Sequence, residues 1–185
     1  MLNLDEDGFI TTSKRVTLKP YIARVPKQFE LMTDEEIYAG VGGTLIADTE
    51  SYENYFLIAL KCVKTGKVII FEIDLDKDIY FNERKLSWIL HSYRVVGFNI
   101  IKYDLPMIWL AYRLQNPKTL QELSRQLING FTKLAELKNE FDFEIFKTNV
   151  VDTIEVCPLK GSLKLYGARI HSPRIQDLPF GYGDI

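Results

Sequence analysis

Apolar residues along the chain gather into short runs in its first half, and these runs predict buried strands. Residues 44–48, 55–63 and 68–73 each form such a run, and a tight turn at 64–67 separates the last two. Because the connections between the three runs are short, we expect the strands to pair as an antiparallel meander. The first half of the chain therefore predicts one edge of a sheet.

The second half alternates short apolar runs with one-sided helical spacing. Strands are predicted at 94–97 and 149–152, and helices at 82–91, 104–114, 120–128, 132–141 and 162–170. Leu86, Ile89 and Leu90 lie on one face of the first of these helices, and Pro106 suits the first turn of the second. A meander followed by alternating strands and helices predicts an α/β fold with a mixed five-stranded sheet flanked by helices.

Residues 1–40 have a different pattern, with charges, Pro20, Pro26 and scattered aromatic residues but no regular period. We expect them to form an extended N-terminal arm, and residues 41–185 to form the folded domain. Thr33 followed by Glu36 is a capping-box pattern, which predicts a short helix at the end of the arm. A contact with a second copy and a tether to a polymerase are both open as roles for the arm.

Composition narrows the class of protein. The chain has 185 residues, 46% hydrophobic and 26% charged, which is ordinary for one globular domain with a sizeable core. A net charge of -2 excludes a broad basic surface, so nucleic acid would have to be bound locally. Cys62 and Cys157 lack the spacing of metal ligands and are expected to pack as small core residues.

Nothing in the chain resembles a targeting or membrane segment. The N-terminus is acidic and lacks the apolar stretch of a signal peptide, and no run approaches the roughly 20 apolar residues of a membrane span. We expect a cytoplasmic protein, in a bacterial or phage-infected cell.

Acidic residues follow two of the predicted strands. Asp48 and Glu50 end the first run, and side chains one residue apart on a strand point to the same face. Like charges placed side by side resist burial, and a divalent cation is the usual means of offsetting them. Asp104 follows the strand at 94–97, directly after Tyr103. Together these acids suggest a metal-dependent phosphoryl-transfer site.

The same residues resemble a known family. Asp48-Thr49-Glu50 resembles the Asp-x-Glu first motif of the DEDD 3′–5′ exonuclease superfamily, which has the ribonuclease H-like fold, and the segment from Asn99 to Asp104 resembles its second motif. Residues 152–180 resemble the stretch before the third motif in phage exonucleases related to DNA-polymerase proofreading domains. The resemblance implies a phage- or prophage-type DNA exonuclease that acts in replication or proofreading.

By this resemblance, hydrolysis would use two Mg²⁺ or Mn²⁺ ions about 3.5–4 Å apart. Asp48 would bridge both ions, Glu50 would hold the ion that activates water, and Asp104 would bind the second ion. The substrate would be a single-stranded or frayed 3′ DNA end, because a scissile phosphate must reach the ions.

Candidate substrate contacts surround the two motifs. The resemblance implies that Asn99 and Tyr103 position the substrate strand, and Thr49 is a further candidate. Single strands are held by aromatic stacking and a few cations. The aromatic candidates are Phe98, Tyr52 and Tyr55, and the cationic ones are Lys164, Lys102, Arg169 and Arg174.

The family's fourth carboxylate, in a Tyr-x-x-x-Asp or His-x-x-x-x-Asp motif, is not found. His171 and Asp177 are separated by five residues, and Pro173 disfavours a helix there. We therefore expect weak activity, or none, from the chain alone, unless a partner chain supplies the third motif. The alternative is a catalytically inactive exonuclease-like module that binds nucleic acid or a replication partner.

Structural explanations compete with these roles. Asp48 and Glu50 are also typical of charges that protect a strand edge, and Asp104 suits the N-terminus of the helix that follows it. Asn99 is typical of a turn after a strand, and Tyr103 of a partly buried core position. Asp152 follows the last strand and fits either a position near the site or a solvated one.

Overall fold

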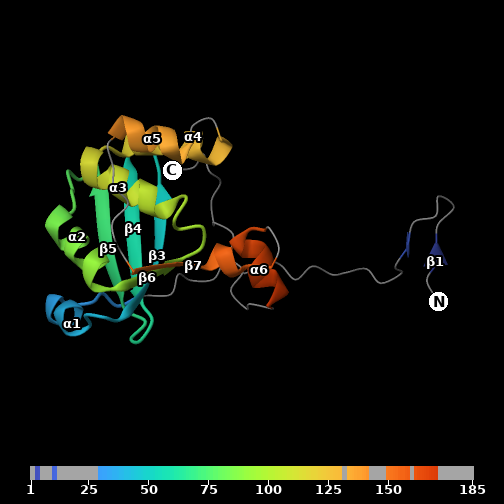
Figure 1. Cartoon of the computed structure of the whole chain (residues 1–185), viewed down its shortest axis with the longest axis horizontal. Helices are drawn as coiled ribbons and strands as arrows, with labels where there is room; N and C mark the ends of the chain where they lie inside the picture. The colour runs from blue at the N-terminus through green and yellow to red at the C-terminus, as the bar shows by residue number, and fades with distance from the viewer. Residues whose placement is uncertain are drawn as a thin grey trace.

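The computed structural model describes residues 3–4, 10–11, 29–130, 133–141, 149–158 and 161–170 (Figure 1). Near the N-terminus, β1 (Asn3–Leu4) and β2 (Ile10–Thr11) pair as a two-stranded antiparallel sheet. The other residues before 29 lie outside the described part, and so does most of the predicted arm.

Five strands form the main sheet. They are β3 (Thr44–Ser51), β4 (Tyr55–Cys62), β5 (Val68–Asp74), β6 (Arg94–Gly97) and β7 (Asn149–Asp152), in the spatial order β5-β4-β3-β6-β7. Neighbours among β3, β4 and β5 are antiparallel, whereas β3, β6 and β7 run parallel. The predicted mixed five-stranded sheet with its three-strand meander is confirmed.

Helices occupy every predicted position in the described part. They are α1 (Asp34–Ala39), α2 (Glu83–Ser92), α3 (Asp104–Leu114), α4 (Pro117–Asn129), α5 (Leu134–Phe141) and α6 (Leu163–Arg169). The capping box predicted at Thr33 and Glu36 is present. α4 begins earlier than predicted because the Asn116 side chain caps it and Pro117 fits its first turn.

One face of the sheet carries the core. Leu45, Ala47 and Thr49 point to this face from β3, and they are continued by buried side chains of β4 and β5. Helices α2, α3 and α4 cover it (Figure 1), and their core side chains, such as Leu86 and Met107, are fully buried. Burial of each large apolar side chain contributes about 1.5–3 kcal/mol, so this face anchors the domain.

β3 is longer than the sequence pattern predicts. The strand was expected to end at Asp48, but its pairing with β4 continues without a break from Leu45, opposite Cys62, to Ser51, opposite Phe56. The hydrogen bonds of this ladder keep the strand extended through its polar end. Both acidic residues of the first motif therefore lie within the strand rather than in a turn after it.

Two further expectations concern the cysteines and membrane-spanning segments. Cys62 is buried in the core as expected, whereas Cys157 is only half-buried, and both are free thiols. In the ranges that the structure describes, every helix is too short or too polar to cross a lipid bilayer.

Candidate functional site

The two carboxylates of β3 lie on the face of the sheet opposite the core. Along the strand, Ile46, Asp48 and Glu50 alternate with the buried Leu45, Ala47 and Thr49. This alternation follows from the two-residue period of an extended strand. Asp48 and Glu50 therefore share one face, as the sequence predicted.

Both of these carboxyls are harder to ionise than usual. Removal of water around the Asp48 carboxyl raises its pKa, although much of the side chain remains exposed and water screens part of the effect. Burial also raises the pKa of Glu50, and the charge of Asp48 adds to that rise. The long contact of 3.5 Å from the Tyr52 hydroxyl to Glu50 opposes the rise only in part. Hydrogen bonds therefore offset the desolvation and mutual repulsion of the Asp48 and Glu50 carboxylates only in part.

Asp104, the first residue of α3, is the most buried of the three predicted ligands, with 4% of its surface exposed. The Thr49 hydroxyl donates a hydrogen bond of 2.7 Å to its Oδ1 atom. The pKa of Asp104 is raised to about 7: burial is the main cause, the Thr49 hydroxyl opposes the rise, and the charge of Asp48 adds to it. Asp104 therefore changes its charge near neutral pH.

A cavity of about 460 Å³ joins Asp48 to Asp104. The ladder between β3 and β6 ends at Ile46, opposite Val96, and the chain turns away after Gly97. α3 then begins beside the polar end of β3, which brings residues 55 positions apart into hydrogen-bond contact. The other side chains and backbone that line the cavity come from Ile46, Ala47, Val96, Gly97, Phe98, Tyr103, Thr153 and Leu163.

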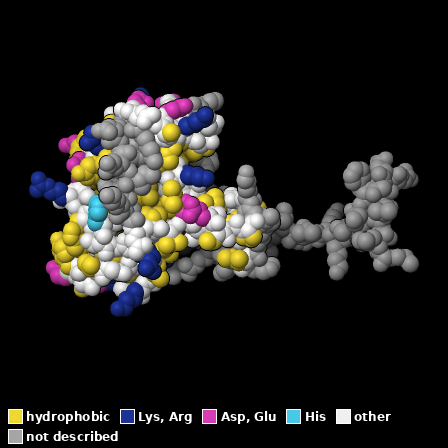
Figure 2. Space-filling model, in the orientation of Figure 1, with side chains coloured by type: hydrophobic (Ala, Val, Ile, Leu, Met, Phe, Trp, Pro, Cys, Tyr) yellow, Lys and Arg dark blue, Asp and Glu magenta, His cyan; other side chains and the backbone are white. Residues whose placement is uncertain are grey.

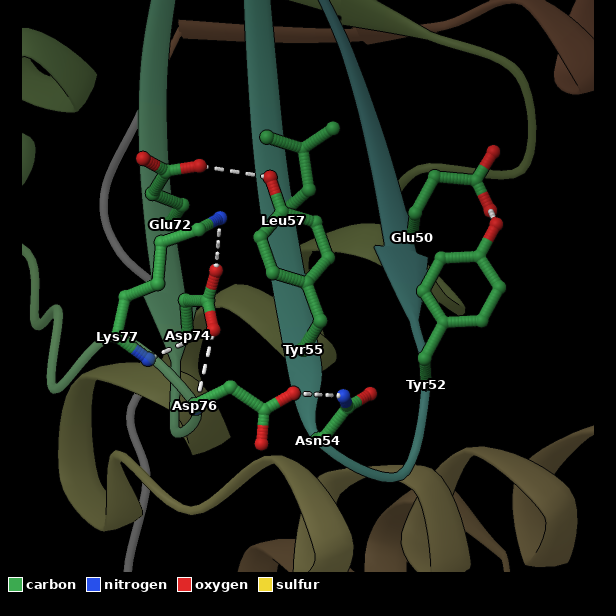
Figure 3. A pocket seen from close by; sticks show the side chains of 9 residues that line it. All are labelled: Glu50, Tyr52, Asn54, Tyr55, Leu57, Glu72, Asp74, Asp76 and Lys77. Atoms are coloured by element: carbon green, nitrogen blue, oxygen red, sulfur yellow. Dashed lines mark hydrogen bonds and ion pairs between the residues drawn. The ribbon is translucent and has the colours of Figure 1, made fainter. Parts of the chain in front are cut away.

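Glu50 lines a different hollow, a neighbouring groove of about 560 Å³ over β3, β4 and β5 (Figure 3). In this groove the Tyr55 hydroxyl donates to Glu72 at 2.8 Å, and the Lys77 ammonium lies 2.7 Å from Asp74. Figure 3 shows Glu50 next to Tyr52, on the far side of the groove from Asp74. The structure therefore places two of the predicted ligands in one cavity and the third beside it.

The described residues hold no group of three or more carboxyl, imidazole or thiol side chains arranged to bind a metal ion. Nor does any described Lys or Arg form an ion pair with Asp48, Glu50 or Asp104. What the structure brings together is a pair of carboxyls, Asp48 and Asp104, whose charges repel each other and are not neutralised by a described cation.

The second motif supplies the wall of the cavity. Tyr103 is half-buried, and its hydroxyl lies 2.7 Å from the Ser124 Oγ atom. Burial raises the pKa of Tyr103, and the charges of Asp104, Glu50 and Asp48 add to this rise. The Phe98 ring lies beside that of Tyr166 on α6, with centroids 6.2 Å apart.

Asn99 occupies a turn, with a φ of 62° that asparagine tolerates better than most residues. Its carbonyl accepts hydrogen bonds from the amides of Lys102 and Tyr103, which begin the approach to α3. The structure thus bears out the turn, and the role in holding substrate stays a prediction.

The remaining candidates are spread widely. Thr49 points to the core side, where its hydroxyl donates a hydrogen bond to Asp104. Tyr52 and Tyr55 line the groove of Figure 3. The side chains of Lys164 and Arg169, and the whole of Arg174, lie outside the described part. In Figure 2 the described Lys, Arg, Asp and Glu side chains are scattered over the face shown.

Asp152 is the residue whose position the sequence left open. It is not solvated: only 4% of its surface is exposed, and its carboxylate accepts hydrogen bonds from the backbone of the turn that leads to Asp104. The available signal was an acidic residue at the end of a short apolar run, the same signal that pointed to Asp48.

Searches of protein-family models, curated proteins and solved structures found no match to this chain.

Proposed function

We propose that this chain is a metal-dependent 3′–5′ DNA exonuclease domain with a ribonuclease H-like fold, of the phage or prophage type that acts in replication or proofreading. The observation that carries the proposal is the pairing of Asp48 on β3 with the buried Asp104 on α3 around one cavity. The strand order also supports it, because the meander lies on one side of β3 and the parallel strands β6 and β7 on the other.

The carboxyl groups fit a hard divalent cation. Asp48 and Asp104 have raised pKa values and no described cationic partner, so a bound ion would relieve both their desolvation and their repulsion. Mg²⁺ and Mn²⁺ prefer such oxygen ligands. Asp48 and Asp104 would hold the metal, with Glu50, which lies on the same face of β3 as Asp48, as the third proposed ligand. When bound, such ions supply an activated water and neutralise the leaving oxygen.

The lining of the cavity suits an unpaired nucleotide. Phe98 and Tyr103 give it an aromatic wall, and aromatic side chains bind single-stranded bases of any sequence by stacking. With a chain net charge of -2, affinity would come from these local contacts and from the bound ions rather than from a broad basic surface. A single-stranded or frayed 3′ end of DNA is therefore the substrate we propose.

One observation favours a second candidate function, that of a catalytically inactive exonuclease-like module which binds nucleic acid or a replication partner. Within the described ranges, three acidic groups do not converge as a ready-made metal site. Such a module would keep the aromatic cavity but would not need Asp48 and Asp104 to bind an ion.

Manganese titration of the purified chain separates the two candidates. We expect Mn²⁺, followed by its electron paramagnetic resonance signal at pH 7.5, to bind the wild-type chain, and Asp48→Asn to weaken binding by about tenfold or more. Asp74→Asn is the matched control, because it neutralises a carboxyl in the neighbouring groove that already has a cationic partner. It should leave Mn²⁺ affinity unchanged.

The same proteins are then incubated with a 5′-labelled single-stranded oligodeoxynucleotide and Mg²⁺ or Mn²⁺. Any shortening should proceed from the 3′ end and should disappear with Asp48→Asn but not with Asp74→Asn. A wild-type chain that binds the oligonucleotide but not Mn²⁺ would establish the inactive module instead. Equal Mn²⁺ affinity in wild type and Asp48→Asn would remove the proposed site.

A further inference from the structure

Asp152 ends β7, directly opposite Gly97 at the end of β6. Its carboxylate is buried and accepts hydrogen bonds from three backbone amides. These are Asn99 N at 2.8 Å, Ile101 N at 3.0 Å and Ile154 N at 3.1 Å. Buried backbone amides require an acceptor, and an ionised acceptor forms the stronger hydrogen bonds.

The two carboxylate oxygens have separate partners. Oδ1 accepts from Asn99 and Ile154, whereas Oδ2 accepts from Ile101. Two of the three amides belong to the turn between β6 and α3, so the carboxylate ties that turn to the end of β7. The Thr153 hydroxyl adds a second tie by donating to the Gly97 carbonyl at 2.9 Å.

This turn leads directly to Asp104. The Asn99 carbonyl accepts from Tyr103 N at 3.0 Å, and the Ile100 carbonyl accepts from Leu105 N at 2.9 Å. The segment that Asp152 holds therefore contacts, through its own carbonyls, the residues on either side of Asp104. The Asp104 side chain in turn accepts a hydrogen bond of 2.7 Å from the Thr49 hydroxyl, on the neighbouring strand β3.

We propose that Asp152 is a positioning residue, which fixes the turn from Asn99 to Tyr103 and thereby the place of the Asp104 carboxyl beside Asp48. The effect on metal binding rests on the function proposed above, whereas the effect on the turn does not. Asp152 itself does not line the cavity that Asp48 and Asp104 share.

Two substitutions in the full chain remove different sets of these hydrogen bonds. Asp152→Ala removes all three. Asp152→Asn keeps an acceptor at the Oδ1 position for Asn99 and Ile154, but it places an amide donor against the amide of Ile101. Asn82→Ala is the control, because it removes a comparable side-chain acceptor for a backbone amide, that of Lys85, at the distant start of α2.

Amide hydrogen exchange, measured residue by residue by nuclear magnetic resonance, tests the turn directly. With Asp152→Asn, exchange at Ile101 should accelerate by about tenfold, and with Asp152→Ala exchange at both Asn99 and Ile101 should accelerate at least as much. Asn82→Ala should accelerate exchange at Lys85 and leave the turn unchanged. If Asp152→Ala does not fold, the selective effect of Asp152→Asn still decides the outcome.

Manganese affinity of the folded proteins tests the consequence for Asp104. We expect Asp152→Asn to weaken Mn²⁺ binding by about tenfold or more, and Asp152→Ala to weaken it further. Asn82→Ala should leave Mn²⁺ binding unchanged. Loss of stability without faster exchange at Asn99 and Ile101 would overturn the positioning role, and so would faster exchange with wild-type Mn²⁺ affinity. If wild type binds no Mn²⁺, the proposed function fails, and the exchange rates from Asn99 to Leu105 alone decide whether Asp152 fixes the turn.

Discussion

Two buried carboxyls of this protein, Asp104 and Asp74, have nearly equal exposure but opposite electrostatics. Asp104 is 4% exposed and Asp74 is 6% exposed. Burial raises the pKa of Asp104 to about 7, whereas the ammonium of Lys77 holds the pKa of Asp74 below its usual value. The backbone amides of Asp76 and Lys77 also donate to Asp74 (Figure 3), while the side-chain donor of Asp104 is a neutral hydroxyl.

The difference teaches that burial alone does not mark a functional acid. Asp74 ends β5 and its charge is compensated within its own turn, which is what a structural carboxylate requires. Asp104 is placed near a second carboxyl, Asp48, with no described cation to compensate either. Carboxyls with perturbed pKa values that lie together in a cavity are typical of functional sites.

The largest effect should come from Asp104→Asn in the presence of EDTA. Asp104 keeps its proton up to about pH 7 in the folded wild type but loses it near pH 4 in the unfolded chain. The contribution of this group to the unfolding free energy is therefore complete below pH 4, and it is lost as pH rises to and through 7. The difference in pKa corresponds to up to about 4 kcal/mol of unfolding free energy. Asp104→Asn should abolish this loss, so that the variant is the more stable protein at pH 8.

Urea denaturation from pH 4 to pH 8 measures this prediction. The gap in unfolding free energy between Asp104→Asn and wild type should widen as pH rises from about 4 to about 7 and change little above that. A gap that stays constant over the whole range would mean that Asp104 is not the titrating group. It would contradict the proposed difference between the pKa shifts of Asp104 and Asp74.

Thr49→Val should have a smaller effect, of about 1.5–3 kcal/mol at pH 8. The substitution keeps the shape of the side chain but removes the donor to Asp104, which stabilises the charged carboxylate more than the neutral acid. The loss of unfolding free energy should therefore be greater at pH 8 than at pH 5. Thr119→Val on α4 provides a comparable change away from the cavity, and its effect should not depend on pH.

Asp74→Asn should have the smallest effect and the opposite sign to Asp104→Asn. The amide oxygen can still accept from the backbone amides of Asp76 and Lys77, so only the contact with the exposed Lys77 ammonium is lost. Because the pKa of Asp74 is lowered, its contribution to stability is present above the unfolded pKa and disappears in acid. The melting temperature at pH 7 should fall by a few degrees at most, and a rise would contradict the comparison.

Much of the fold followed from local patterns. The ends of β6, α3 and β7 were predicted correctly, because short apolar runs and a proline in the first turn of a helix are local signals. The end of β3 was predicted too early, since its polar residues are kept extended by pairing with β4. The start of α4 was predicted too late, since its cap at Asn116 was not recognised.

The candidate site also has features that local sequence patterns predicted and features that only the tertiary structure shows. Alternation along one strand was enough to place Asp48 and Glu50 on one face, because that relation depends only on the extended backbone. The sequence could not show that Asp48 and Asp104 share a cavity while Glu50 lines the next one, or that Asp152 is buried against the turn before α3. Those relations depend on the parallel pairing of β3, β6 and β7, which brings distant segments together and removes water from carboxyls that are ordinary in the unfolded chain.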